Sequence, residues 1–274
     1  PWVINPSWYW CSYSRTFFWV FSINDFFSIG IIKSSFPNDI PALAAYSKPS
    51  AIILSAKITV SEPSKISIKN FFPGDYHVIP NGIDIKKFSK KHPYPSAYDK
   101  DSYNLLFVGR VNESRKGLSW LIKAFSILRL QRSDIKLIIV GQGDPDPEIY
   151  RIIGERGLEG IIFTGEVSDE NLIAYYQHAD IFCAPNTGNE SFGMIIIEAM
   201  AASTSVVASD ISGFRSVMKN NEHGIFVKPR DEINLAKYSS KILLSIFSFI
   251  VFVSKFERLI KSIKSFVEIF YGFY

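Results

Sequence analysis

Short apolar runs alternate with helical patterns through the middle of the chain, and this alternation limits the fold more than any other feature. The apolar runs hold five to seven residues each and cover residues 104–110, 135–141, 160–165, 180–185, 205–209 and 224–229. The helical patterns cover residues 116–132, 147–156, 169–178 and 191–202. Strands that are apolar along their whole length are typical of a parallel sheet covered on both faces. We therefore predict an α/β fold, a Rossmann-like doubly wound parallel sheet, with ligands beyond the carboxyl ends of its strands.

The two ends of the chain differ from this middle part. Of the first 30 residues 11 are aromatic, and they show neither alternation nor a helical period. We predict an atypical, remnant or mistranslated N-terminal segment at 1–54, and the end of a first Rossmann domain with its linker at 55–100. The complete Rossmann domain is expected at 101–235. An atypical helical segment, rich in Lys, Ser, Phe and Ile, is expected at 236–274.

Composition narrows the class of protein without naming a ligand. With 47% hydrophobic and 20% charged residues, the chain is globular and not disordered. Its net charge of +4 suits anionic ligands or membrane surfaces. The two cysteines, Cys11 and Cys183, lie far apart, which favours a reducing compartment over a disulfide framework. Cys183 is expected in the core of a strand.

One segment, residues 242–254, is apolar enough to raise the question of a membrane span. It holds only 13 residues between Lys241 and Lys255, short of the roughly 20 that a spanning helix needs. A buried or interfacial helix is the prediction for this segment.

The loop at 109–117 places Arg110, Arg115 and Lys116 directly before a helix. Cations beside a helix N-terminus, where backbone N–H groups point outward, form a natural anion site. A solvated charged turn explains this loop equally well when it is taken alone.

The loop at 141–148 suggests two kinds of site, and we expect neither. Gly141 and Gly143 begin a dinucleotide fingerprint, but Asp146 stands where the third glycine belongs, and acids there repel a pyrophosphate. Asp144 and Asp146 also resemble a pair of divalent-metal ligands. Prolines on both sides favour a solvated turn, so no nicotinamide cofactor and no metal are predicted.

The loop at 164–171 contains Ser168 and Asp169 just before a helical pattern. Asp169 could line a base pocket by accepting hydrogen bonds from ring nitrogens. Either residue could instead cap the helix, and the local sequence favours the cap.

The stretch at 184–200 carries two carboxylates, Glu190 and Glu198, on either side of a Ser-Phe-Gly turn. We expect a helix from near Ser191, with Glu198 about two turns inside it, so that eight residues separate the two backbones by roughly 12 Å. That exceeds the approximately 5–9.5 Å of a glycosidase carboxyl pair. The two acids are therefore expected to serve different parts of one extended ligand, with Gly193 opening backbone N–H groups to a phosphate. The alternative is that Glu190 is only a favourable acid in the first turn of the helix and Glu198 only an exposed helix residue.

Five motifs, taken together, resemble a known family. They are "NGID" (81–84), "GRVNESRKG" (109–117), "IVGQGD" (139–144), "FTGEVSDE" (163–170) and "NESFGMIIIEAMAAST" (189–204). Their order and spacing are similar to the nucleotide-sugar half of family 4 retaining glycosyltransferases, which have the two-Rossmann GT-B fold. Phosphatidylinositol mannosyltransferases and related GDP-mannose-dependent enzymes show the greatest likeness. The resemblance covers about residues 55–235.

The resemblance implies a role for each motif residue. Arg110 and Lys116 would neutralise the departing diphosphate, with Gly109 beside them, and Glu198 would bind the ribose hydroxyls. Asp169 and the backbone near Val167 would lie by the base. Glu190 and the backbone of Ser191, Phe192, Gly193 and Met194 would bind the sugar and its phosphate. Arg110, Lys116 and Glu190 are thus the implied catalytic residues.

The resemblance also implies the partners. The expected donor is a nucleotide sugar, with GDP-mannose favoured over UDP sugars, and the acceptor is a lipid or saccharide. No metal, other cofactor or nucleic acid is expected. A cytoplasmic location, with room for peripheral association at the inner membrane face, fits this chemistry.

Some positions depart from the family pattern. Ser203 replaces a glycine at the exit of the helix after the second glutamate, and Leu172 replaces a lysine that lies beside guanine. None of His77, His92, His178 and His223 has the family's catalytic setting, and "KITVSEPSK" (57–65) resembles only the last strand and helix of the first domain. We expect this chain to bind a donor weakly and to transfer nothing alone. A non-catalytic nucleotide-sugar module, or a GT-B epimerase or phosphorylase, are the alternatives.

Overall fold

The structure is a computed structural model, and it describes residues 18–23, 26–31, 57–246 and 248. The chain divides into two compact units. The first comprises residues 1–83 with two later segments, Asn189–Met194 and Ser212–Val217. The second comprises Asp84–Gly188, Ile195–Ile211 and Met218–Tyr274.

The first unit contains two small sheets. Strands β1 (Phe18–Ile23) and β2 (Phe26–Ile31) pair antiparallel, whereas β3 (Lys57–Thr59) and β4 (Tyr76–Val78) pair parallel. Helix α1 (Glu62–Lys69) connects β3 to β4, and α7 (Ser212–Arg215) completes the unit. Ser61 caps α1 by accepting a hydrogen bond from the Ser64 N–H over 3.1 Å. The strand and helix predicted within residues 57–65 are therefore confirmed.

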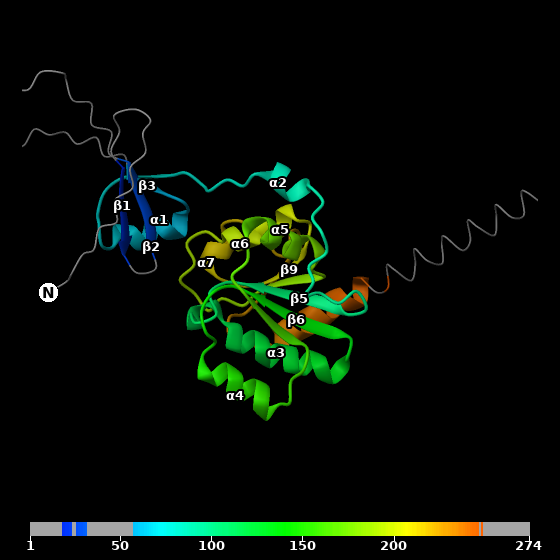
Figure 1. Cartoon of the computed structure of the whole chain (residues 1–274). Helices are drawn as coiled ribbons and strands as arrows, with labels where there is room; N and C mark the ends of the chain where they lie inside the picture. Colours follow the sequence, from blue (N-terminus) through cyan, green and yellow to red (C-terminus); the bar gives the residue numbers. More distant parts are fainter. Residues whose placement is uncertain (1–17, 24–25, 32–56, 247, 249–274) are drawn as a thin grey trace, which may run out of the picture. The chain divides into compact units, whose positions relative to one another are not determined.

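The second unit is built on six parallel strands (Figure 1). They are β5 (Tyr103–Val108), β6 (Ile135–Val140), β7 (Ile161–Gly165), β8 (Ile181–Ala184), β9 (Ser205–Ser209) and β10 (Ile225–Val227). Their order across the sheet is β10-β9-β8-β5-β6-β7, and every pair is parallel. The chain fills one half of the sheet outward from β5 and the other half outward from β8, which confirms the doubly wound Rossmann order.

Helices cover both faces of this sheet (Figure 1). They are α3 (Leu118–Gln131), α4 (Pro147–Glu155) and a helix over 232–246 on one face, and α5 (Asp169–His178) and α6 (Met194–Ala201) on the other. The short α2 (Ile85–Ser89) lies against α5. The predicted helix at 191–202 is α6, although α6 begins three residues later. Within the described ranges, the structure has no helix of the length and apolar character needed to cross a membrane.

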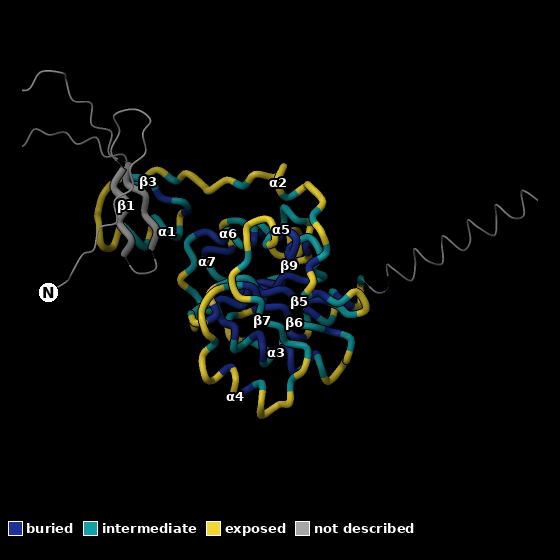
Figure 2. The backbone as a smooth tube through the Cα atoms, viewed as in Figure 1, coloured by how far each residue is buried: buried dark blue, intermediate teal, exposed yellow. Residues whose placement is uncertain are grey.

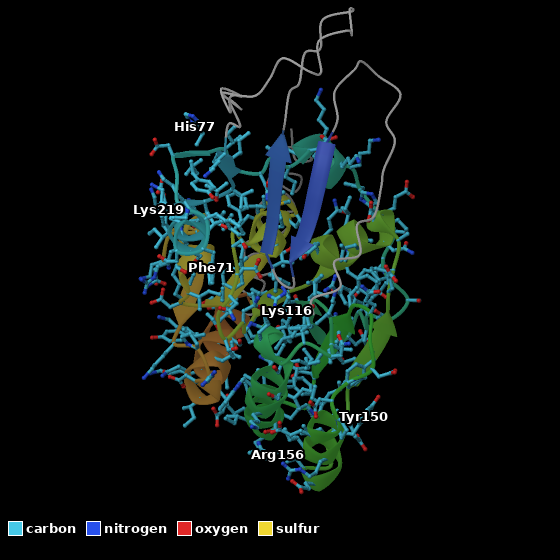
Figure 3. The ribbon with its side chains drawn as sticks, turned by 90° about the vertical axis from the view of Figure 1, so that its left-hand side faces the viewer. Phe71, His77, Lys116, Tyr150, Arg156 and Lys219 are labelled. Atoms are coloured by element: carbon cyan, nitrogen blue, oxygen red, sulfur yellow. The ribbon has the colours of Figure 1, made fainter. Side chains whose placement is uncertain are left out.

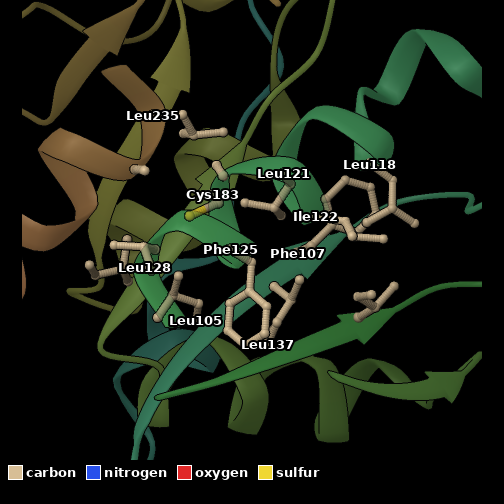
Figure 4. Close-up of a cluster of buried hydrophobic side chains, with 14 of the residues drawn as sticks. Leu105, Phe107, Leu118, Leu121, Ile122, Phe125, Leu128, Leu137, Cys183 and Leu235 are labelled. Atoms are coloured by element: carbon tan, nitrogen blue, oxygen red, sulfur yellow. The ribbon is translucent and has the colours of Figure 1, made fainter. Parts of the chain in front are cut away.

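The core explains why the strands are apolar throughout. On one face, Leu105 and Phe107 of β5 pack with α3 residues such as Phe125 (Figure 4). The intervening strand residue Leu106 is also 0% exposed, so both faces are covered (Figure 2). Burial of each such side chain contributes about 1.5–3 kcal/mol. Cys183 lies in this core as predicted, and burial raises the pKa of its thiol to about 12. The resulting rigid sheet fixes where its strands end.

Candidate functional site

The loops after β5 and β8 meet at the point where the winding of the sheet reverses. β5 and β8 are neighbours, and their connections run to opposite halves of the sheet. Ligands of doubly wound sheets bind at this switch point, beyond the carboxyl ends of the strands. The backbone N–H of Thr187, after β8, donates to the Arg115 carbonyl over 2.8 Å. This hydrogen bond joins the two loops.

Gly117 brings the start of α3 against the loop after β8. Its φ is 75°, and a Cβ at this position would lie 2.0 Å from the Pro185 carbonyl oxygen. Only glycine permits both the left-handed conformation and the close approach. Gly117 is also the N-cap residue of α3 and offers no side-chain cap. Helix α3 therefore begins at the switch point, and its first-turn N–H groups receive no hydrogen bond from a side chain at residue 117.

Three cations and one carboxylate stand in the loop before α3. The Glu113 carboxylate contacts Arg110 Nη1 through Oε1 and Arg115 Nη2 through Oε2, both at 2.7 Å. Partial burial opposes ionisation of Glu113, but hydrogen bonding from Arg110 and the charge of Arg115 outweigh it and lower the pKa of the carboxyl. Arg110 is exposed, and its side chain is 56% accessible. The loop thus carries a net excess of positive charge at a helix N-terminus, as an anion site requires.

Lys116 ends the 3₁₀ turn (Ser114–Lys116) that precedes α3 and is labelled in Figure 3. Its side chain runs back along the loop, so that Lys116 Cδ would lie 3.6 Å from a Cβ placed on Gly109. Gly109 is the first residue after β5, and the lysine stem lies beside it. The predicted neighbours Gly109, Arg110 and Lys116 are therefore brought together by one turn.

Glu198 is held by a buried tyrosine. Its Oε2 accepts a hydrogen bond from the Tyr176 hydroxyl over 2.9 Å, and the carboxylate is half-buried. Burial raises the pKa of Glu198, the hydrogen bond from Tyr176 opposes that rise, and the charge of Asp169 adds to it. The alternative of an exposed helix position is thus wrong for Glu198. A half-buried carboxylate with accepting capacity left on it suits a ligand's hydroxyl groups.

Asp169 occupies the first turn of α5, on the carboxyl side of β7. Ser168 is the N-cap, and its hydroxyl accepts from the Asn171 N–H over 3.3 Å. The cap predicted at Ser168 or Asp169 is therefore Ser168, which leaves the exposed Asp169 carboxylate outside that role. Val167 lies just before the cap and is partly buried.

The segment from Glu190 to Met194 belongs to the first unit. There the Ser61 hydroxyl donates to the Ser191 carbonyl, and a Cβ on Gly213 would lie 2.0 Å from the Glu190 carbonyl oxygen. Phe192 is buried.

The expectation that a helix begins near Ser191 is wrong. Gly193 has φ 99°, which a right-handed helix does not admit, so α6 starts at Met194. Glu198 is the fifth residue of α6, about one turn from its start and not two. The estimate of roughly 12 Å between the two acids assumed one continuous helix and therefore loses its basis.

The glycines of the loop after β6 serve packing between loops. A Cβ on Gly141 would lie 1.9 Å from the Gly109 carbonyl oxygen, and one on Gly143 would lie 2.9 Å from the Asn112 side chain. Asp146 is the N-cap of α4 and accepts from the Glu148 N–H over 2.9 Å. These roles account for the sequence of this loop without a dinucleotide fingerprint.

Two residues of the candidate site were not singled out from the sequence. Glu113 could have been found, because it stands three residues after Arg110 and two before Arg115, within reach of both. Tyr176 gives no such signal: the pair at 175–176 reads as ordinary core aromatic residues in a helix, and its contact with Glu198 spans 22 positions.

Comparisons with known proteins agree with the sequence motifs. The model of the family described as "Glycosyl transferases group 1" matches residues 89–246. A phosphatidyl-myo-inositol mannosyltransferase of Mycobacterium leprae is 37% identical over 182 residues, which are 66% of this chain and 47% of that protein. The chain thus spans about half the length of such curated relatives.

Solved structures give the same picture of the fold. Sucrose-phosphate synthase from Thermosynechococcus elongatus aligns with a TM-score of 0.55 at 30% identity, covering 68% of this chain and 48% of that one. A glycosyltransferase from Rickettsia africae aligns with a TM-score of 0.63 at 24% identity, covering 72% and 55%. The second likeness concerns the fold alone.

Proposed function

Because the chain belongs to the family of group 1 glycosyl transferases, we propose that this protein transfers a hexosyl group from a nucleoside-diphosphate sugar to a lipid or saccharide acceptor with retention of configuration. The observation that supports the proposal most is the cationic turn of Arg110, Arg115 and Lys116 at the switch point. It lies at the start of α3 and is joined to the loop after β8. GDP-mannose is the favoured donor: the relative named above is a mannosyltransferase, which supports mannose, and the choice of GDP rests on the motif resemblance.

The proposed chemistry is electrostatic. When the bond between the sugar's anomeric carbon and the diphosphate breaks, negative charge develops on the departing phosphate oxygen. Arg110, Lys116 and the N–H groups at the start of α3 would stabilise that charge. The proposal assigns this task to the chain's own cations instead of a divalent metal.

The donor's other parts are assigned to the remaining motif residues. Glu198 would bind the ribose hydroxyls, and Asp169 with the Val167 backbone would lie by the base. Glu190 and the backbone of Ser191 to Met194, within the first unit, would bind the sugar. That last assignment stays a prediction from the motif.

Binding of GDP, UDP and guanosine to the 274-residue chain tests the proposal. In calorimetry, Arg110→Gln and Lys116→Gln should each weaken GDP binding by roughly tenfold or more, the range of a charge-assisted contact. Guanosine binding should change little. Lys123→Gln is the matched control, because it removes a cation from α3 that pairs with Glu148 on α4. Equal losses for guanosine and GDP would contradict the phosphate role.

A transfer assay separates an enzyme from a binding module. The chain is incubated with labelled GDP-mannose and a panel of lipid and sugar acceptors, with and without a chelator of divalent metals. Acceptor-dependent transfer that survives the chelator supports the proposed activity and overturns the expectation that this chain transfers nothing alone. Donor binding without transfer to any acceptor agrees with that expectation, and transfer abolished by the chelator contradicts the metal-free assignment.

A further inference from the structure

Tyr176 is fixed by contacts of both its ring and its backbone. Its ring is 0% exposed and packs edge-on against Phe182 of β8, with ring centroids 5.2 Å apart. Its carbonyl oxygen accepts a hydrogen bond from the Thr204 hydroxyl over 2.5 Å. Thr204 follows α6, and its own N–H donates to the Ala199 carbonyl over 3.0 Å. The backbone and the ring of Tyr176 are thus tied to β8 and to the end of α6.

The direction of the tyrosine side chain matters for the site. Side chains on a helix lean toward its N-terminus, and the N-terminus of α5 lies on the carboxyl side of β7. Tyr176 is seven residues beyond Asp169, about 10 Å along the helix, and its long side chain recovers part of that distance. The hydroxyl at the end of this buried side chain donates a hydrogen bond to Glu198 Oε2 over 2.9 Å.

The contact leaves Glu198 oriented and still able to accept. A carboxylate has about four lone-pair sites on its two oxygens, and Tyr176 takes one site on Oε2. A phenol held by a packed ring loses little freedom when it makes this bond, whereas a free glutamate side chain has many rotamers to choose from. The remaining sites on both oxygens can accept from two adjacent hydroxyl groups.

We propose that Tyr176 is a positioning residue, whose buried hydroxyl holds the Glu198 carboxylate in the orientation that accepts the neighbouring 2′ and 3′ hydroxyls of the donor ribose. This inference rests on the proposed function, because it takes the diol from the nucleotide sugar. It makes the ribose preference of the site a property of α5 as well as of α6.

Tyr176→Phe tests the inference, since it removes one oxygen and keeps the buried ring. Tyr98→Phe is the control. Tyr98 is also buried, and its hydroxyl donates to the Tyr175 carbonyl of α5 over 2.6 Å. This hydrogen bond contacts the same helix but does not contact Glu198. We expect similar losses of thermal stability in the two variants. At pH 7, Tyr176→Phe should bind GDP roughly tenfold more weakly, close to the affinity for 2′-deoxy-GDP, whereas Tyr98→Phe should keep the ribose preference.

A second measurement needs no ligand. Tyr176 and Asp169, both on α5, are the groups that act on the Glu198 charge. Removing the tyrosine hydroxyl should raise the pKa of Glu198 further, so its carboxyl carbon should titrate at higher pH by NMR in Tyr176→Phe than in the wild type. As the pH is lowered, GDP binding should therefore begin to weaken at a higher pH in Tyr176→Phe than in the wild type.

These outcomes distinguish the inference from the proposed function. The positioning role is overturned if the pKa of Glu198 in Tyr176→Phe equals that in the wild type. It is also overturned if Tyr176→Phe prefers GDP over 2′-deoxy-GDP as strongly as the wild type does. A wild-type chain that binds no nucleoside diphosphate overturns the proposed function instead. The Glu198 titration, measured without nucleotide, then still decides whether Tyr176 controls the carboxylate.

Discussion

The Thr187 N–H and the Arg115 carbonyl oxygen lie 2.8 Å apart and join two loops that are 72 residues apart in sequence. The Thr187 hydroxyl reaches the same oxygen over 3.4 Å. Because this oxygen belongs to the turn before α3, the position of the cations in that turn depends on the loop after β8. Gly117 makes the approach of the two loops feasible.

Gly117→Ala should cost more stability than its φ angle alone explains. An L-residue at φ 75° costs about 1–2 kcal/mol, and the new Cβ would also press on the Pro185 carbonyl. Gly157→Ala is the matched control, with φ 54° and no atom within 4 Å of the added Cβ. In urea unfolding, we expect Gly117→Ala to lose at least about 1 kcal/mol more than Gly157→Ala. Equal losses would mean that the two loops move apart freely.

Ser203→Gly should stabilise the chain. Ser203 has φ 63° at the exit of α6, and its N–H donates to the Met200 carbonyl over 3.0 Å. Glycine adopts this left-handed conformation without the Cβ penalty, so we expect a gain of about 0.5–1 kcal/mol in the free energy of unfolding. Ser205→Gly, at the exposed start of β9, should instead destabilise, because glycine gains nothing in an extended strand. A loss in Ser203→Gly would contradict the strain assigned to this position.

Glu198→Gln should stabilise the ligand-free chain at neutral pH while weakening nucleotide binding. Burial raises the pKa of Glu198, the Tyr176 hydrogen bond lowers it in part, and the Asp169 charge raises it. The folded state therefore holds this proton more tightly than the unfolded state, and stability falls as pH rises through the interval from the unfolded to the folded pKa.

The neutral amide of Glu198→Gln removes the loss of stability that the ionised carboxylate causes at neutral pH. We expect a gain of about 0.5–2 kcal/mol at pH 7.5, the range that single stabilising substitutions commonly give. The gain should shrink as the pH is lowered below the unfolded pKa, where wild-type Glu198 is protonated in both states. Glu155→Gln, at an exposed pair with Arg151, should show no such pH-dependent gain. A gain in Glu198→Gln that is independent of pH would show that the carboxylate charge is not its cause.

The sheet could be predicted from the sequence because both faces of its strands are covered. Runs such as residues 135–140 are apolar at nearly every position, which little besides a buried parallel strand requires. The altered helix exit at Ser203 was predicted only because the family pattern has a glycine there, and the structure gives Ser203 φ 63°. The cause of the strand pattern lies in neighbouring residues, whereas the helix exit needed the resemblance.

The parts of the site that could not be predicted depend on contacts between distant segments. The start of α6 was placed too early because nothing in the sequence showed that Gly193 takes φ 99° beside Phe214. The partner of Glu198 was missed because Tyr176 lies on another helix, two elements back. The roles of the motif residues in donor binding stay predictions.

Gln177 gives a last prediction, because its side-chain amide holds residues 86–93, near the start of the second unit. Its Nε2 donates to the carbonyl oxygens of Phe88 and Lys90, both over 2.6 Å, and its Oε1 accepts from the His92 N–H over 3.1 Å. Gln177→Ala removes these three hydrogen bonds, together with the contact of Oε1 with His92 Nδ1 at 3.2 Å, and leaves the backbone partners to find water. Because each hydrogen bond costs about 0.5–1.5 kcal/mol net, residues 86–93 should open at least roughly tenfold more often.

Limited trypsin cleavage at Lys90 and Lys91, together with amide hydrogen exchange across residues 86–93, measures this opening. Both should rise in Gln177→Ala while exchange in β5 and β6 stays at the wild-type rate, because those strands lie in the core. Gln131→Ala is the control: this glutamine lies at the C-terminal end of α3, and its Oε1 accepts from the Ser240 hydroxyl over 3.1 Å. It should leave cleavage at Lys90 unchanged. If Gln177→Ala does the same, the segment is held by the packing of α2 on α5 and by the hydrogen bond from His178 Nε2 to the His92 carbonyl, and not by the amide.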